Sequence, residues 1–208
     1  MALQLDLVGI FHRDFKGPER LQKLLSILSP DVVSLEYNPK SIIELDQLEK
    51  YKQSAEGMAA LVAHFCRKEN YLPETVRQAL PNLYFEYFVS KEYCKYDQKQ
   101  LLFSDLGDRD LAQQNLQYAF SNSPQTIQQQ TEIDYRMANQ YQMIDIPAEQ
   151  VPYLIRRDAY TETILRPLSR KVAHLVGAWH LFGNYHNLYE RLRDLNPRRI
   201  MLNQADAL

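Results

Sequence analysis

Two histidines near opposite ends of the chain follow the same short pattern. The pattern is Gly-x-x-His, and it occurs as Gly9-Ile-Phe-His12 and as Gly177-Ala-Trp-His180. Each copy closes an apolar run of strand length, where a glycine lets the backbone turn sharply or lets another group approach closely. Ligands of open α/β sheets bind at the carboxyl ends of the strands. If the two strands pair in parallel, both imidazoles therefore lie at that edge of one sheet.

Two other predicted strands also end in ionisable side chains. One ends at Glu36, and the other is followed by Asp105, Asp108 and Arg109. Two neutral imidazoles and a carboxylate form a ligand set for a divalent transition metal, with positions left open for water and substrate. Such a metal lowers the pKa of bound water and polarises a carbonyl. Without a metal, the same groups suit a general base and an electrostatic stabiliser, and spacing alone leaves both interpretations open.

Each of these residues also has a purely structural interpretation. A single histidine is more often a hydrogen-bonded structural residue, and Glu36 could cap the helical segment that follows Pro39. Asp108 could cap the next helix with Arg109 in a surface ion pair, and the run Arg156-Arg157-Asp158 could be a solvated helix face. The expected convergence of the strand ends at one edge is what favours a functional site.

The order of the apolar runs predicts an α/β protein with a central, mostly parallel sheet of about four to five strands flanked by helices. Strands are expected at 3–10, 31–36, 100–103, 172–176 and 199–203, and helices at 18–28, 110–120, 125–143, 147–165 and 183–195. The segment 125–143 is rich in glutamine and only weakly periodic, so we expect an exposed helix there. No linker divides the chain, which favours one domain over residues 1–208.

Residues 39–99 are too many for a single crossover helix, so we expect a helical insertion that lies over the carboxyl edge of the sheet as a cap. The insertion carries a dense group of aromatic residues, namely Tyr84, Phe85, Tyr87, Phe88, Tyr93 and Tyr96. These side chains could line a substrate cleft, but the favoured interpretation is that they form the core of the helical layer.

Composition narrows the class of protein further. A hydrophobic content of 45% and a charged content of 24% are ordinary for a globular chain. A net charge of −2 gives no reason to expect nucleic acid or an anionic membrane as a partner. We expect no signal peptide, no membrane span and a cytoplasmic protein. Cys66 and Cys94 lack metal-type spacing, so we expect reduced structural thiols.

The motifs together resemble the TraB/PrgY/TIKI family, within the wider group of erythromycin-esterase-like and ChaN-like proteins. The matching pieces, in chain order, are Gly9-Ile-Phe-His12, Leu35-Glu36, Gly107-Asp108-Arg109-Asp110, Arg157-Asp158 and Gly177-Ala-Trp-His180-Leu-Phe-Gly183. They span nearly the whole chain, and the paired Gly-x-x-His patterns with an intervening glutamate are moderately specific together. The resemblance implies an α/β fold with a central parallel sheet.

For the TIKI branch, the resemblance also implies metal-dependent peptide hydrolysis. Carried over by position, it suggests His12, Glu36 and His180 as metal ligands or catalytic groups. The candidate metals are manganese, cobalt and zinc. The resemblance also implies that Arg109 and Arg157 orient the substrate or the ligands, and that Asp108 and Asp158 support these two arginines.

The main hypothesis is therefore a metal-dependent hydrolase of peptide or ester bonds. Because ChaN-like relatives bind haem, the alternative is a non-catalytic protein that binds haem or a peptide in a pocket walled by Tyr84 and Tyr87. A third reading is an interaction protein with a degenerate site. The substrate, the metal and a homodimeric state are left open by the sequence.

Overall fold

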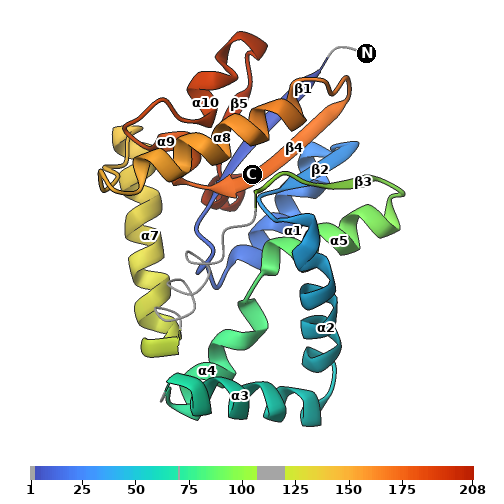
Figure 1. Ribbon diagram of the computed structural model, residues 1–208, viewed down its shortest axis with the longest axis vertical. Helices are drawn as coiled ribbons and strands as arrows, with labels where there is room; N and C mark the ends of the chain where they lie inside the picture. Colours follow the sequence, from blue (N-terminus) through green and yellow to red (C-terminus); the bar gives the residue numbers. More distant parts are fainter. Residues whose placement is uncertain (1–2, 70, 107–119) are drawn as a thin grey trace.

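A five-stranded, all-parallel sheet forms the centre of the molecule, in the order β3-β2-β4-β1-β5 (Figure 1). The computed structural model describes residues 3–69, 71–106 and 120–208. The strands are β1 (Gln4–Ile10), β2 (Val32–Leu35), β3 (Gln100–Phe103), β4 (Lys171–Gly177) and β5 (Arg198–Met201). The predicted α/β class is confirmed, and each strand lies at its predicted place in the chain.

The two strands that carry the Gly-x-x-His patterns are neighbours. β1 and β4 pair in parallel, with Gly9 opposite Val176 and Ile10 opposite Gly177. Both strands are covered on both faces, which is why their sequences are nearly continuous apolar runs. Residues from opposite ends of the chain therefore leave the sheet side by side, as the sequence predicted.

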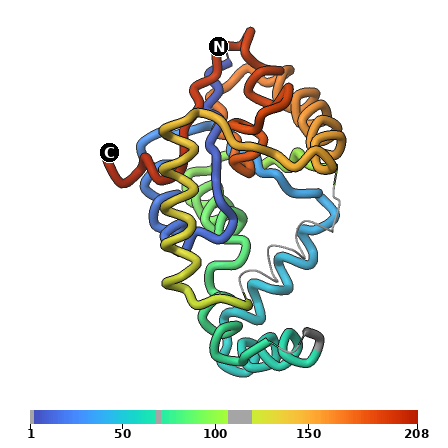
Figure 2. Tube along the Cα trace, turned by 90° about the vertical axis from the view of Figure 1, so that its left-hand side faces the viewer, coloured from blue at the N-terminus to red at the C-terminus, as the bar shows by residue number. Residues whose placement is uncertain are grey.

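Helices cover both faces of the sheet (Figure 2). On one face lie α1 (Gly17–Leu28), α5 (Phe85–Tyr96) and the C-terminal 3-10 helix η4 (Leu202–Ala207), and α1 packs against both of the others. On the other face lie α8 (Val151–Leu165) and α10 (Leu188–Arg191). The buried leucines of α1 have the spacing of an amphipathic helix: Leu21, Leu24, Leu25 and Leu28.

The segment between β2 and β3 leaves the sheet at its carboxyl side and then returns (Figure 1). It contains η1 (Pro39–Ser41), α2 (Ile42–Lys52), α3 (Ala55–Glu69), α4 (Pro73–Ala79) and η2 (Leu80–Asn82) before α5. The outer helices bury a small cluster of their own, which includes Val62, Val76 and Leu80. α5 packs against β2 and β3, so Phe85 and Tyr87 belong to the main core, whereas Tyr96 is exposed.

Two predicted helices differ from those in the structure, and a third cannot be compared. α7 (Pro124–Tyr141) is a helix but not a wholly exposed one, because it buries Ile127, Thr131, Tyr135 and Ala138 along one face. The helix predicted to start at Pro147 begins at Val151 instead. The predicted helix 110–120 falls almost entirely outside the described residues.

The single helix predicted for 183–195 is wrong. The chain instead forms α9 (Trp179–Phe182), then α10, then the 3-10 helix η3 (Arg193–Leu195). Gly183 ends α9 in an extended conformation. Asn187 then starts α10, because its side chain accepts a hydrogen bond from the backbone N–H of Glu190. His180 consequently lies in a short helix rather than in the predicted loop.

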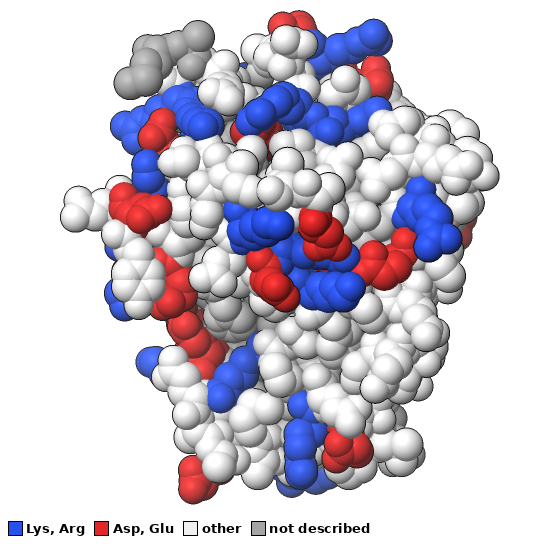
Figure 3. All heavy atoms as spheres, turned by 180° about the vertical axis from the view of Figure 1, so that it is seen from behind, with Lys and Arg blue, Asp and Glu red and all other residues white. Residues whose placement is uncertain are grey.

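Among the described helices, none combines the length and the apolar character that crossing a membrane requires. On the face seen from behind, acidic and basic side chains are interspersed rather than separated (Figure 3).

Candidate active site

The strand ends converge around Gly177. A Cβ atom placed on this glycine would lie 3.4 Å from Glu36 Oε2, 3.5 Å from His12 Nε2 and 3.6 Å from His180 Cδ2. Glu36 directly follows β2, while His12 and His180 come shortly after the neighbouring strands β1 and β4. The structure therefore brings together the three residues that the sequence predicted to meet.

Glu36 lies between three N–H donors. Its Oε2 accepts a hydrogen bond from the Gly177 backbone at 2.7 Å. Its Oε1 lies 2.5 Å from Arg157 Nη2 and 2.8 Å from His180 Nε2. Burial alone would raise the pKa of this carboxyl group, but the charges of Arg157 and His180 hold the pKa well below its usual range. Glu36 is therefore ionised at neutral pH. Glu36 does not cap the helical segment that follows, because the side chain of Asn38 accepts a hydrogen bond from the Lys40 N–H there.

His180 is enclosed by carboxylates on both sides. Its Nε2 faces Glu36, and its Nδ1 is hydrogen-bonded to Asp158 Oδ1. The hydroxyl of Tyr185 donates to the other oxygen of Asp158 at 2.8 Å. Burial opposes protonation of this imidazole, but Glu36 and Asp158 together raise the pKa of His180 to about 10. At neutral pH His180 is thus an imidazolium that donates to both carboxylates.

Arg157 links two strand ends from helix α8. Its Nε and Nη2 donate to the two oxygens of Asp105 at 2.7 and 2.8 Å, and Nη2 also contacts Glu36. Arg157 is 8% exposed and Asp158 is 1% exposed, so this part of α8 is not a solvated helix face. The bidentate pairing fixes the orientation of the Asp105 carboxylate, and the shared Nη2 ties Glu36 to it. Asp108 and Arg109, the other members of the predicted cluster, lie outside the described residues.

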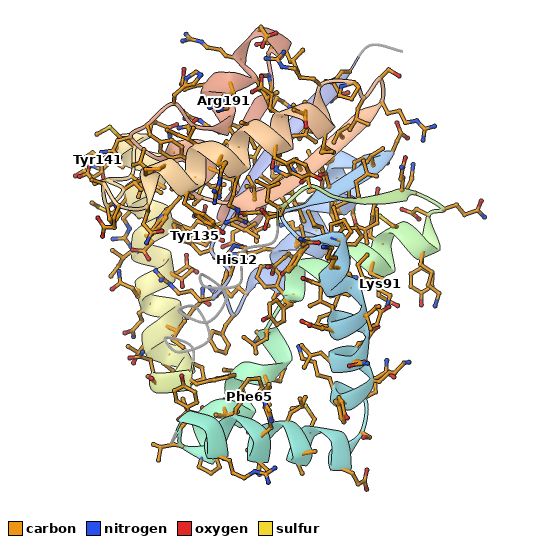
Figure 4. The ribbon with its side chains drawn as sticks, in the orientation of Figure 1. His12, Phe65, Lys91, Tyr135, Tyr141 and Arg191 are labelled. Carbon is orange, nitrogen blue, oxygen red and sulfur yellow. The ribbon has the colours of Figure 1, made fainter. Side chains whose placement is uncertain are left out.

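His12 is the exposed member of the site. One third of its side chain is accessible, at 33%, and it lies between the sheet and the outer helices (Figure 4). Its Nδ1 is 2.7 Å from Glu86 Oε1, and the Tyr37 hydroxyl donates to the same oxygen at 2.5 Å. Burial works against the charged imidazole, but Glu86 raises the pKa of His12 above its ordinary value.

Glu86 is the site residue that the sequence analysis missed. It belongs to α5 and is 2% exposed, and its Oε2 is buried without a hydrogen-bond partner among the described residues. A carboxylate within an aromatic run is a usable signal, because a charge buried among apolar residues requires a partner. The partner could not be read from the sequence, since 73 residues separate it from His12.

Both imidazoles of the site are thus oriented in the same way. Each has its Nδ1 on a buried carboxylate and its Nε2 directed toward Gly177 or Glu36. A neutral histidine whose Nδ1–H is held by a carboxylate presents Nε2 as a base or as a ligand, which suits His12, whereas Nε2 of the His180 imidazolium donates to Glu36. Of the remaining histidines, His186 is exposed, and His174 is buried inside the sheet on Ser34.

The donor set suits a metal in kind but not in arrangement. Among the described residues, no three His, Cys, Asp or Glu side chains are placed to hold an ion. Glu36 already accepts from N–H groups on both oxygens, and both nitrogens of His180 face carboxylates. As arranged, these side chains do not fit a metal ion. Manganese, cobalt or zinc on His12, Glu36 and His180 stays a prediction.

His174 predicts a dependence of stability on acid pH. Burial lowers the pKa of His174 to about 4, so it stays neutral in the folded protein while the unfolded chain takes up a proton below about pH 6.5. Stability is therefore lost as pH falls from about 6.5 to about 4, by roughly 3 kcal/mol from this residue. Urea unfolding of the wild type and of His174→Gln at pH 7 and 4.5 should show a smaller loss in the variant. Equal losses would contradict this role.

Comparisons with protein-family models, with curated proteins and with solved structures find no match to this chain. The resemblance to the TraB/PrgY/TIKI family stays a prediction. The structure defines the class of protein: it is an α/β protein with a histidine–carboxylate site at the carboxyl ends of its central strands.

Proposed function

We propose that this protein is a hydrolase of peptide or ester bonds in which His12 acts as the general base. The observation that carries the proposal is the pairing of His12 Nδ1 with the buried carboxylate of Glu86, at 2.7 Å. This pairing fixes the tautomer and leaves Nε2 facing the space beside Gly177, which Glu36 and His180 also border. An oriented, partly exposed imidazole is the commonest general base in enzymes.

The reaction follows from these positions. His12 Nε2 takes a proton from a water molecule as the water oxygen attacks the carbonyl carbon. Glu86 stabilises the imidazolium that forms, in the way a carboxylate supports histidine in other hydrolytic sites. The negative oxygen of the tetrahedral intermediate develops near the cations Arg157 and His180, which lowers its energy. Collapse of the intermediate breaks the bond to the leaving group, which receives the proton from His12.

The arrangement gives Glu36 a supporting part in this reaction. Because its carboxylate is shared by Gly177, Arg157 and His180, it fixes the wall of the site opposite His12. The alternative of haem or peptide binding stays a prediction. Tyr87, one of its expected wall residues, is 2% exposed, and its hydroxyl donates to Asp46.

Gly177→Ala tests the proposal directly. The added Cβ would make contacts of 3.4 to 3.6 Å, which are ordinary van der Waals distances, so we expect normal folding. The methyl group would, however, occupy the space between His12 and His180. We expect hydrolysis to fall by about tenfold or more, with the melting temperature little changed. The assay is a panel of nitrophenyl esters and fluorogenic peptides, run with a chelator and with added manganese, cobalt or zinc.

Gly9→Ala is the matched control from the first Gly-x-x-His pattern. Its Cβ would lie 2.8 Å from Met201 Sδ, away from the imidazoles. We therefore expect Gly9→Ala to lower the stability of the fold rather than to block the space beside the imidazoles. Absence of hydrolysis by the wild type under every condition of the panel would overturn the proposed function. Full activity of Gly177→Ala would place the reaction elsewhere.

A further inference from the structure

A second buried polar cluster, formed by Asp14, Arg20 and Tyr135, adjoins the loop that carries His12. Asp14 and Tyr135 are fully buried, and Arg20 is 2% exposed. Tyr135 is also a member of the main hydrophobic core, and the cluster is separate from the site described above. Buried charges are costly unless they are paired and hydrogen-bonded, so the position of this cluster calls for a physical reason.

The cluster holds the backbone on both sides of His12. The Tyr135 hydroxyl donates to Asp14 Oδ2 at 3.1 Å and accepts a weak hydrogen bond from the Phe11 N–H at 3.4 Å. The Phe11 ring also packs edge-on against Tyr135, with centroids 4.8 Å apart. Asp14 Oδ1 in turn accepts from the Lys16 N–H at 2.9 Å. The loop is thus fastened immediately before His12 and again a few residues after it.

Arg20 anchors the cluster to two other parts of the fold. Its guanidinium donates to Asp14 Oδ2 at 2.9 Å and pairs with Glu132 of α7 at 2.7 Å and with Asp206 of η4 at 2.5 Å. These three carboxylates hold the guanidinium in one place, and through Asp14 they hold the loop.

Helix α7 reaches the same loop at two further points. Gln128 Oε1 accepts a hydrogen bond from the Phe15 N–H at 2.8 Å, and Asp134 pairs with Arg13. With Tyr135 on Phe11 and Asp14, α7 therefore contacts residues 11, 13, 14 and 15 of the loop. His12, within the same loop, is paired instead with Glu86 of α5.

We infer that Tyr135 is a positioning residue for the reaction: its hydroxyl donates to the Asp14 carboxylate that Arg20 also holds, and so keeps the loop 11–16 in the form that places His12 against Glu86. This inference rests on the proposed function of His12. It also gives a task to the glutamine-rich helix α7, for which the sequence suggested none.

Tyr135→Phe is the test, because it removes only the hydroxyl and keeps the ring that packs on Phe11. We expect kcat to fall about tenfold or more while KM changes less than about twofold, since the base and not the substrate is displaced. The second readout is the NMR signal of the His12 Nδ1–H, which is assigned by its absence in His12→Gln. In Tyr135→Phe this signal should broaden or disappear as the hydrogen bond to Glu86 loosens.

Tyr141→Phe is the matched control, because it makes the same chemical change on the same helix at a residue that is 58% exposed. Its kcat and its His12 signal should equal those of the wild type. An unchanged His12 signal in Tyr135→Phe would overturn the inference, whatever the activity. If the wild type hydrolyses nothing, the proposed function fails, and the imidazole signal still decides the positioning role.

Discussion

Replacing His12 with glutamine is expected to lower kcat by about 10²- to 10⁴-fold, the range typical for removal of a general base. Glutamine keeps a polar side chain beside Glu86 but cannot take a proton from water. His12 is also the exposed member of the site, so the change leaves the buried network of Glu36, Arg157 and His180 in place. The measurement is steady-state hydrolysis of the best substrate of the panel.

The control for this variant is His186→Gln. His186 is an exposed histidine on the segment that follows His180, and its replacement should leave kcat within about twofold of the wild type. Equal losses in the two variants, or no loss in His12→Gln, would exclude His12 as the base.

The pH profile adds a second test of the same residue. Only the neutral imidazole accepts a proton, so activity should fall as pH drops through the raised pKa of His12. Burial disfavours the charged form and Glu86 favours it, so Glu86→Gln should lower this pKa. The acidic limb of the profile should then move to lower pH, while the maximal rate also falls because the imidazole is less well oriented. A limb that stays in place would show that Glu86 does not act on His12.

Arg157→Met is expected to destabilise the fold by about 3–5 kcal/mol, because it leaves the buried Asp105 without its cation and removes one of the two cations beside Glu36. Arg157 bridges Asp105 and Glu36, and all three side chains are at most 10% exposed. Methionine has a similar length and no charge, so the loss measures the missing ion pairs more than the missing volume. Urea unfolding at pH 7 gives the free-energy difference.

Acid should reduce this difference. The folded pKa of Glu36 lies well below 4.5, so its contribution to stability is present above that value and is lost as pH falls through the folded pKa. The variant lacks Arg157, a main cause of the depressed pKa, so the two proteins should approach each other in stability at low pH.

Arg166→Met is the matched control, since this arginine also pairs with two carboxylates, Glu162 and Asp194, but lies at the surface. Its loss should be below about 1 kcal/mol. Equal losses from the two variants would mean that the Arg157 ion pairs at the strand ends stabilise the fold no more than surface ion pairs do.

The sequence predicted the frame of this site because local patterns specify it. Apolar runs identify strands that are buried on both faces, and parallel pairing then requires their carboxyl ends to share an edge. His12, Glu36 and His180 could be placed together on that basis. The resemblance added Arg157 and Asp158, and both do border the site.

The rest depended on contacts that no local pattern encodes. Glu86 reaches His12 only because α5 returns to the sheet after three outer helices, and that path is a property of tertiary packing. Tyr135 lies in a glutamine-rich segment whose buried face was not evident from the sequence. Two of the buried positions on that face are Thr131 and Ala138, which are not large apolar residues. The turn at Gly183 depended on the contact of its neighbours with Ile144 from a distant loop.

A double-mutant cycle on His12 and His180 tests most directly whether the two ends of the chain build one catalytic site. The measurement is kcat/KM for ester or peptide hydrolysis by the wild type, His12→Gln, His180→Gln and the double variant. If both histidines serve one reaction, the double variant should be little worse than the more damaged single variant. Losses that multiply would mean that the two histidines act independently, and no loss in either single variant would mean that the reaction does not use them.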